Sequence, residues 1–465
     1  MRLGLLFGAG VAVVCVVAAL VAGDDDGLMY MVTIDGGSSG SRVHVHLVNM
    51  HQESTLPEVK SKFTHKVKPG LSSYTSNPAQ AAQSIRDLLE HALDNVPQSH
   101  WRRTPVFLKA TAGLRSVTQS EAAEILDHCA EAISRTAFQF ERDWANVITG
   151  KEEGTFGWIA ANYLLGRFGT QPNAHLSPIG VIEMGGASMQ VSFIPNPNEK
   201  VDERAILPVP IGGQIYPLYT HSFLGYGLDQ ALDRLEVNIG SGSKNPCVPE
   251  TSRPGDFGQC MALMPPLLQL DQCPAVQSCS FNGVYSPSTA GIEFVAIENF
   301  YYTSDFFDVA GSPDQLYSIA QEWCGKDLKA ISDRFTKDPP EEAAKRCFSA
   351  AYIHSVLTKG LKINDKFPNV KFIREVGGVG IDWAIGSVLF EALRLKAARR
   401  SVLPDRPEIL ALPAPRNTKF SISNLWVFVL PVLILVIAFF LVRNSAKRGP
   451  IRYAPIGNTR GLPML

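Results

Sequence analysis

Short apolar runs alternate with longer segments of helical spacing along most of the chain. Four apolar or alternating runs predict strands at Met29–Ile34, Val43–Val48, Val106–Ala110 and Gly180–Ile182. Helical spacing extends from Pro78 to Pro97 and recurs at Glu121–Phe138 and Trp158–Leu165. Strands that alternate with helices in this way predict an α/β protein.

Two of the predicted strands end in an acid that is followed by glycines and a serine. Ile34-Asp35-Gly36-Gly37-Ser38-Ser39 is echoed by Ile182-Glu183-Met184-Gly185-Gly186-Ala187-Ser188. The two acids are 148 residues apart (183 − 35), which is about one domain length. This weak repeat predicts two related α/β domains that face each other, the first over residues 28–170 and the second over residues 171–400.

The two ends of the chain carry long uncharged apolar segments. Leu3–Ala22 precedes three aspartates, and Leu425–Val442 precedes a tail that contains five basic residues and no acid. Each segment is long enough, or nearly so, to cross about 30 Å of hydrocarbon. We therefore expect an N-terminal signal anchor or transmembrane helix over residues 1–23, with a cleaved signal peptide as the alternative. A Pro-rich stalk (401–423), a second membrane helix (424–443) and a basic cytosolic tail (444–465) are expected at the other end, which places the body in a lumenal or extracellular compartment.

Charge and cysteine content refine this picture. The chain has 465 residues and a net charge of −1, so it has no basic face for nucleic acid. Six of its 8 cysteines cluster in the second half of the body, where an oxidising compartment favours disulfides. Neighbours in sequence suggest the pairs Cys247–Cys260, Cys273–Cys279 and Cys324–Cys347, although sequence alone does not fix connectivity. Neither these spacings nor the histidines indicate a zinc site.

The two glycine loops have the composition of a phosphate site. Glycine lets a ligand approach bare backbone N–H groups, which form an anion nest that serine hydroxyls can extend. An acid at the strand end cannot bind phosphate, but it can hold a divalent cation directly or through water. A single loop of this kind is better explained as a hairpin turn. Two matched loops favour a phosphate chain clamped between the domains, with a cation held by Asp35 and Glu183. No Gly-Lys-Ser/Thr follows, so this is not a Walker P-loop.

Two further stretches suit the same chemistry. Leu108–Arg115 ends a buried strand with a hydroxyl, a small residue and a glycine between two cations. Thr149–Trp158 places Glu153 before a glycine and just ahead of an apolar helix, from where its carboxylate can project into a cleft. Phosphoryl transfer to water requires a carboxylate that orients and deprotonates the water. A surface turn and a solvated glutamate pair are the simpler explanations of these two stretches.

Five stretches together resemble the characteristic regions of the nucleoside triphosphate diphosphohydrolase (apyrase, GDA1/CD39-type) family. They are IDGGSSGSR, LKATAGLR, ITGKEEGTFGWIAANYLLG, IEMGGASMQ and VGGVGIDWAIG, in the family's order and between about residues 28 and 395. The resemblance implies two actin/hexokinase-like (ribonuclease H-like) domains with the active site in the cleft between them. It also implies hydrolysis of the terminal phosphate of nucleoside tri- or diphosphates with Ca²⁺ or Mg²⁺.

The resemblance also implies roles for residues at matching positions. Glu153 would be the general base, Asp35 and Glu183 would hold the metal through water, and Trp383 would lie beside it. Tyr302 falls where the family stacks a base. The phosphate-binding and positioning residues would be Ser38, Ser39, Gly40, Thr111, Gly185, Gly186, Ala187, Ser188 and Gln190.

The chain departs from the family pattern in a few places and mixes features of its branches. Glu183 stands where Asp is usual, Met189 replaces a common Thr, and Gly36 replaces Ala or Cys. KPGLSSY and SHWRRTPVFLKATAGLR resemble the Golgi and endoplasmic-reticulum nucleoside diphosphatases, whereas CSFNGVYSP resembles the cell-surface branch. The Golgi is therefore the favoured location and the cell surface the alternative.

Two other functions compete with a membrane-anchored nucleotide phosphohydrolase. A sugar kinase or exopolyphosphatase could use the same fold, but membrane anchors and lumenal cysteines disfavour a cytosolic kinase. A non-catalytic lumenal receptor with a dead nucleotide cleft is the other, and the presence of Glu153, Asp35 and both serine loops disfavours it.

Overall fold

The computed structural model of the chain describes residues 27–50, 56–169, 171–240, 242–273, 278–309, 312–363 and 370–400. The terminal apolar segments, the Pro-rich stalk and the basic tail lie outside these residues. Among the helices that are described, none is long and apolar enough to cross a membrane.

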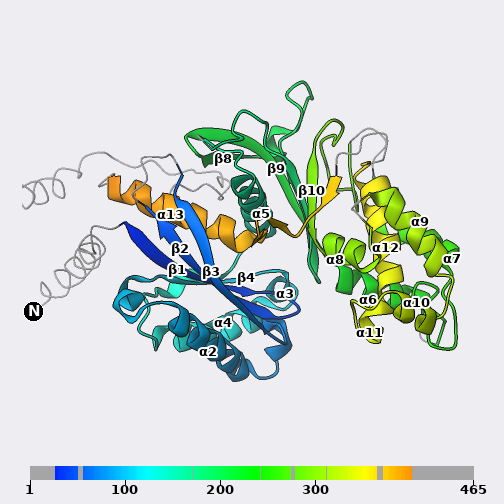
Figure 1. The fold of residues 1–465 in the computed structure, drawn as a ribbon, viewed down its shortest axis with the longest axis horizontal. Helices are drawn as coiled ribbons and strands as arrows, with labels where there is room; N and C mark the ends of the chain where they lie inside the picture. The colour runs from blue at the N-terminus through cyan, green and yellow to red at the C-terminus, as the bar shows by residue number, and fades with distance from the viewer. Residues whose placement is uncertain are drawn as a thin grey trace, which may run out of the picture. The chain divides into compact units, whose positions relative to one another are not determined.

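The first sheet has five strands in the order β3-β2-β1-β4-β5 (Figure 1). Its strands are β1 (Leu28–Gly36), β2 (Ser41–Asn49), β3 (Glu58–Val67), β4 (Val106–Ala110) and β5 (Ala145–Val147). β1 pairs antiparallel with β2 and parallel with β4. One face packs on α2 (Pro78–Asn95) and α4 (Gln119–Ser134), where alternate residues such as Val32 and Ile34 meet Leu88 and Ile125.

The second sheet has six strands in the order β11-β10-β6-β7-β9-β8. Its strands are β6 (Gly180–Met184), β7 (Ser188–Phe193), β8 (Ile206–Ile211), β9 (Gln214–Leu224), β10 (Phe294–Glu298) and β11 (Val370–Phe372). β6 pairs antiparallel with β7 and parallel with β10, just as β1 pairs with β2 and β4. The weak sequence repeat therefore has a structural counterpart: each glycine loop connects the two strands of an equivalent hairpin.

Two helices, α5 (Gly150–Leu164) and α13 (Trp383–Arg400), contribute to the packing between the sheets. α13 contacts both: Val388 and Ala392 pack with Met31 of β1, and Ile385 packs with Val295 of β10. In Figure 1, α13 (orange) runs along the blue first sheet. Side chains on these inner faces are therefore positioned by residues from both halves of the chain.

A helical layer covers the other face of the second sheet. Its helices are α6 (Leu228–Ile239), α7 (Phe257–Leu268), α8 (Asn299–Phe306), α9 (Pro313–Trp323), α10 (Leu328–Arg334), α11 (Pro340–Ala343) and α12 (Arg346–Ser355). The short α3 (Ala112–Arg115) follows β4, and the two-residue strands β12 (Glu375–Val376) and β13 (Val379–Gly380) precede α13.

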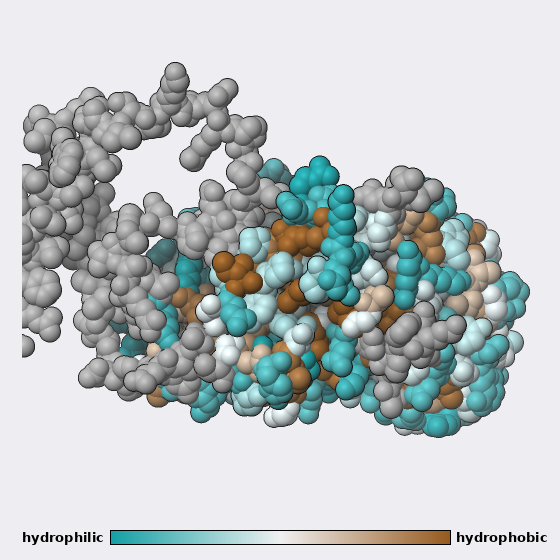
Figure 2. All heavy atoms as spheres, turned by 90° about the horizontal axis from the view of Figure 1, so that it is seen from above, coloured by the Kyte–Doolittle hydropathy of each residue, from teal (hydrophilic) through white to brown (hydrophobic). Residues whose placement is uncertain are grey.

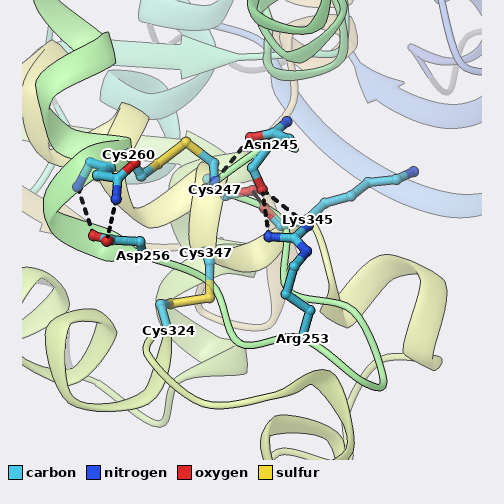
Figure 3. Close-up of a disulfide and its surroundings, with 10 residues drawn as sticks. Asn245, Cys247, Arg253, Asp256, Cys260, Cys324, Lys345 and Cys347 are labelled. Atoms are coloured by element: carbon cyan, nitrogen blue, oxygen red, sulfur yellow. Dashed lines mark hydrogen bonds between the residues drawn. A yellow bond between two sulfur atoms is a disulfide. The ribbon is translucent and has the colours of Figure 1, made fainter. Parts of the chain in front are cut away.

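All three predicted disulfides are present: Cys247–Cys260, Cys273–Cys279 and Cys324–Cys347. Figure 3 shows the first and third of them close together among these helices, and Cys129 is a buried free thiol.

The predicted elements exist, but two helix boundaries were wrong. The helix expected at Glu121–Phe138 begins at Gln119, because Thr118 and Glu121 form a capping box, and it ends at Ser134. The helix expected to start at Trp158 begins eight residues earlier at Gly150 (158 − 150), again behind a capping box, formed by Thr149 and Glu152. Glu153 therefore lies inside the first turn of α5 rather than ahead of the helix.

The surface of the body is a mosaic of polar and apolar side chains. In the view of Figure 2, apolar residues (brown) form several groups separated by polar ones (teal). Large apolar side chains that are exposed include Ile215 and Val237, with exposed fractions of 71% and 79%. Single exposed apolar residues are common on soluble domains and indicate no partner by themselves.

A buried ion pair joins the first sheet to α13. Lys109 Nζ of β4 lies 3.4 Å from Glu391 Oε1, and both side chains are about nine-tenths buried. Arg394 Nε lies 2.9 Å from the other oxygen of Glu391. Charges removed from water are stable only while they remain paired, so this contact couples β4 to the helix that begins at Trp383.

We expect Lys109→Met to lower the free energy of unfolding by about 3 kcal/mol, because it leaves Glu391 buried with Arg394 as its remaining partner. Urea unfolding of the full chain measures this change. The double variant Lys109→Met/Glu391→Leu should recover most of the loss, since an apolar pair can replace a buried ion pair. A double variant as unstable as the single one would contradict this account.

Candidate active site

The two strand-end acids face the layer between the sheets. Side chains alternate along a strand, so Asp35 lies on the same face of β1 as Met31, which packs against α13. Glu183 likewise shares its face of β6 with Val181, which packs with α5 residues. A Cβ on Gly157 of α5 would lie 2.9 Å from Glu183 Oε2, so this glycine makes room for the carboxylate.

The two glycine loops meet. A Cβ on Gly186 would lie 3.0 Å from Ser38 Oγ, which places the second loop against the first. The N-terminus of α6 holds the second loop through two backbone hydrogen bonds. Leu228 N donates to Gly185 O (2.9 Å), and Gln230 N donates to Gly186 O (3.1 Å). Thr111 N donates to Gly36 O (3.1 Å) and so fastens the end of β4 to the first loop. Backbone and hydroxyl groups thus converge from both sheets, as an anion site requires.

A cavity of about 100 Å³ that opens to solvent lies between the loops. It is lined by Asp35, Gly37, Ser38, Ser39, Gly40, Arg42, Lys66, Thr111, Ala112, Glu153, Glu183, Gly185, Gly186, Ala187, Ser188, Glu298, Asp382 and Trp383. Twelve of the fourteen residues predicted for the site from sequence are among them. Gln190 lies behind the wall, and Tyr302 of α8 is not part of the lining. Six separate stretches of the sequence (35–66, 111–112, 153, 183–188, 298 and 382–383) therefore line one pocket.

Two polar side chains, Arg115 and Gln190, hold Glu153 in the wall of the cavity. Arg115 Nη2 donates to Glu153 Oε2 (2.5 Å) and lies 3.3 Å from Ser188 Oγ. Gln190 Nε2 donates to the same carboxylate oxygen (3.1 Å) and to Ser188 Oγ (2.7 Å). Burial raises the pKa of Glu153, and the Arg115 guanidinium opposes that rise. The result is a fixed carboxylate beside a hydroxyl, with a basicity above that of an exposed glutamate.

The charge of the cavity calls for a cation. Five carboxylates and two cationic side chains line it. Burial raises the pKa of Asp35 to about 8, and burial together with Glu153 and Glu298 raises the pKa of Glu183 well above its ordinary value. Asp35 Oδ1 and Glu183 Oε2 are buried without a hydrogen-bond partner. Buried acids without a partner are satisfied by a positive ion, and a polyphosphate could not enter such a pocket without one.

The arrangement fits a hydrated ion rather than a directly coordinated one. In the part of the chain that is described, no three acid, histidine or cysteine side chains converge closely enough to ligate a metal ion. Water molecules can supply ligands between an ion and these carboxylates, since Mg²⁺ usually keeps several of its waters. The donor set consists of hard oxygens, which suits these two ions.

Sequence reasoning missed four charged residues of the lining: Arg42, Lys66, Glu298 and Asp382. One of them had a usable pattern: Phe294–Ile297 is a buried apolar run followed by Glu298, much as the apolar run of β1 is followed by Asp35. Asp382 is fixed by its neighbours: its Oδ1 accepts from Ala384 N (2.6 Å), and His44 Nε2 lies 3.2 Å from its Oδ2. Arg42 and Lys66 come from β2 and β3, which are close to the loops only in the folded sheet.

We expect Gly70→Ala to lower kcat/KM about tenfold or more, since displacements of about 1 Å in a site can cost about 10²-fold. A Cβ at this position would lie 2.3 Å from Ser38 O and 2.5 Å from Gly37 O, both backbone atoms, so the first loop would have to move. Steady-state kinetics measure the change. Gly325→Ala is the control, because nothing lies within 4 Å of its Cβ; equal activity of both variants would show that the position of the first loop does not matter.

Comparisons with known proteins agree with this geometry. A family model described as GDA1/CD39 (nucleoside phosphatase) family matches residues 22–403. "Probable apyrase 6" of Arabidopsis thaliana is 31% identical over 411 residues, covering 78% of this chain and 72% of the relative. "Ectonucleoside triphosphate diphosphohydrolase 8" of Rattus norvegicus is also 31% identical over 411 residues, covering 77% of this chain and 81% of the relative. Among solved structures, a nucleoside triphosphate hydrolase from Neospora caninum superposes with a TM-score of 0.60 at 16% identity, covering 85% of this chain and 98% of that chain, which indicates a shared fold.

Proposed function

The chain belongs to the GDA1/CD39 (nucleoside phosphatase) family, and on that premise we propose that it is a membrane-anchored enzyme that hydrolyses the terminal phosphate of nucleoside tri- and diphosphates. Its class is that of hydrolases acting on phosphoric anhydrides. One observation carries the proposal: two matched glycine-serine loops from two sheets enclose a cavity that also contains Glu153. The fold is α/β with two mixed sheets, and residues 28–170 and 171–400 form the two actin-like domains of the proposal.

The phosphate chain binds between the loops in this proposal. Ser38, Ser39 and Gly40 contact the terminal phosphate from one side, and Gly185–Ser188 contact it from the other. The close approach of Ser38 to Gly186 supports a shared ligand. Thr111 lies at the base of the phosphate site. Tyr302 contacts the nucleobase, a role supported by its position on α8 four residues after Glu298 (302 − 298).

Glu153 acts as the general base. Its carboxylate accepts a proton from water, the water oxygen attacks the terminal phosphorus, and the bond from that phosphorus to the bridging oxygen breaks. The nucleotide leaves with the electron pair of that bond. Arg115 and Gln190 hold the carboxylate, and the Ser188 hydroxyl lies within reach of both, so it can also orient the water.

Enzymes of this family generally depend on a divalent cation. Asp35 and Glu183 would hold Ca²⁺ or Mg²⁺ through water, with Trp383 nearby, as their unpartnered oxygens and the composition of the lining support. When bound, such an ion neutralises phosphate charge. Glu183 carries one methylene more than the Asp usual at this position, which supports a difference in cation preference rather than a loss of activity.

The location proposed is a membrane, with the body on the lumenal or extracellular side. The three disulfides support an oxidising compartment. The Golgi remains our preferred location and the cell surface the alternative, on the sequence features that resemble the two branches. No role in nucleic-acid binding is proposed, given the net charge of −1.

The first experiment is phosphate release by the full chain in detergent from ATP, ADP, UDP and GDP, with Ca²⁺ or Mg²⁺. Faster turnover of UDP and GDP than of ATP supports a Golgi-type diphosphatase, whereas turnover of ATP followed by ADP supports a surface-type apyrase. Absence of turnover with either ion, for a chain whose folding is verified by circular dichroism, would refute the proposal and favour a non-catalytic receptor. A requirement for a sugar acceptor would favour a kinase.

A further inference from the structure

Glu298 reaches the cavity against the alternation of its strand. Val295 and Ile297 of β10 belong to the cluster that contains α5 and α13, whereas Phe294 and Ala296 belong to the cluster on the helical side. Continued alternation would point residue 298 at that apolar helical side. The Glu298 side chain lines the cavity instead.

An unusual backbone conformation redirects it. Glu298 has φ 60° and ψ −120°, in a region that L-residues with side chains rarely adopt. The next residue fixes the turn, since Asn299 Nδ2 donates to Met184 O (2.9 Å) at the end of β6. A conformation of this kind is strained and persists where the surrounding structure imposes it. Glycine would adopt this conformation without strain. The presence of a glutamate here therefore indicates that its side chain has a function.

The surroundings limit what that function can be. Glu183 pairs with Ile297 across the sheet and Met184 pairs with Glu298, so the two acids end neighbouring parallel strands. Arg42 lies near enough to lower the pKa of Glu298, which burial raises, but the described residues include no ion pair to the Glu298 carboxylate. Arg42 is instead 3.8 Å from Asp382. The carboxylate is therefore half-buried, free to accept hydrogen bonds and directed at the cavity.

A separate observation points to the ligand. Glu183 is only 8% exposed, lines the cavity, and has an oxygen without a hydrogen-bond partner. Asp35 has one as well. Three strand-end carboxylates that share a cavity repel one another in the absence of a cation, and a hydrated ion supplies water O–H groups that can donate to all three.

We propose that Glu298 is a third carboxylate of the cation site and holds the hydrated divalent ion together with Asp35 and Glu183. This inference rests on the proposed function, because it adds a residue to the cation site assigned there. A contact to ribose hydroxyl groups is the other use such a carboxylate could have, and the experiment separates the two.

The test is the affinity of the full chain for Mn²⁺, measured from the electron paramagnetic resonance of free Mn²⁺, with a non-hydrolysable imidotriphosphate nucleotide present. Glu298→Gln keeps the shape of the side chain and removes its charge. It should raise the Kd for Mn²⁺ about tenfold or more, the usual effect of losing a partner in the outer sphere of a metal. Its melting temperature without metal should stay the same or rise, since one member of a repelling cluster is gone.

Two further variants complete the design. Glu298→Gly relieves the backbone strain and should also bind Mn²⁺ weakly. In the absence of metal, its melting temperature should be no lower than that of the wild type. Glu293→Gln is the matched control. Glu293 precedes the start of β10, at the end opposite to Glu298, and its side chain is exposed, so this variant should bind Mn²⁺ as the wild type does.

The outcomes are distinct. Wild-type Mn²⁺ affinity in Glu298→Gln, with weak binding in Asp35→Asn, overturns this inference and leaves the proposed cation site standing. Wild-type affinity in Asp35→Asn, Glu183→Gln and Glu298→Gln alike overturns the proposed site itself. If Glu298→Gln keeps its affinity but no longer distinguishes ribonucleotides from 2′-deoxyribonucleotides, Glu298 contacts ribose and the inference is wrong. Weak binding with a large loss of metal-free stability indicates a structural role and also contradicts it.

Discussion

Glu153→Ala is expected to lower kcat by about 10²–10⁴-fold, the range that loss of a general base produces, while the nucleotide still binds. The carboxylate is held by Arg115 and Gln190 next to the Ser188 hydroxyl, so alanine removes the proton acceptor without emptying the phosphate loops. Single-turnover kinetics and the affinity for a non-hydrolysable nucleotide measure the two effects separately. A selective loss of kcat would show that the carboxylate acts in the transition state rather than in binding.

The control for this experiment follows from the structure. Glu152 is the neighbouring acid, but its carboxylate accepts from Thr149 N (2.7 Å) and closes the capping box of α5, so alanine there would loosen the start of the helix. Glu152→Gln keeps the cap, because glutamine serves the same role in a capping box. We expect nearly unchanged kcat in this variant. Normal turnover in Glu153→Ala would eliminate Glu153 as the base.

The fold was predictable where local pattern and tertiary packing agree. The first strand alternates because one of its faces packs on α2 and α4 and the other on α13, and the short run at Val106–Ala110 matches β4 residue for residue. The repeat of acid, glycines and serine was informative because equivalent hairpins carry it in both sheets. Local disulfides were also recoverable from sequence, since each joins cysteines separated by 6 to 23 positions.

The rest of the site depends on contacts that sequence does not display. Arg42 and Lys66 line the cavity because β2 and β3 lie beside β1 in the folded sheet. Short sequence motifs do not reveal this pairing. The start of α5 was missed because the apolar pattern begins only at Phe156, whereas the helix is started by the polar capping box at Thr149. Glu298 is the clearest case: alternation along β10 predicts the wrong face, and only the backbone at φ 60° explains its position.

Arg115→Met is expected to move the acidic limb of the kcat profile to higher pH by about 1–3 units, the usual effect of an adjacent opposite charge on a carboxylate. Burial raises the pKa of Glu153 and Arg115 opposes it, so removing the guanidinium raises that pKa further. The base must be deprotonated to act, and kcat therefore falls about tenfold for each unit at pH values below the new limb and recovers above it. Arg115→Lys keeps a positive charge and should shift the limb less, although it loses the contact of Arg115 Nη1 with Ile148 O (3.1 Å). If the acidic limb lies at the same pH in the wild type and in Arg115→Met, Glu153 is not the group that titrates. This holds even if Arg115→Met and Arg115→Lys both lose activity.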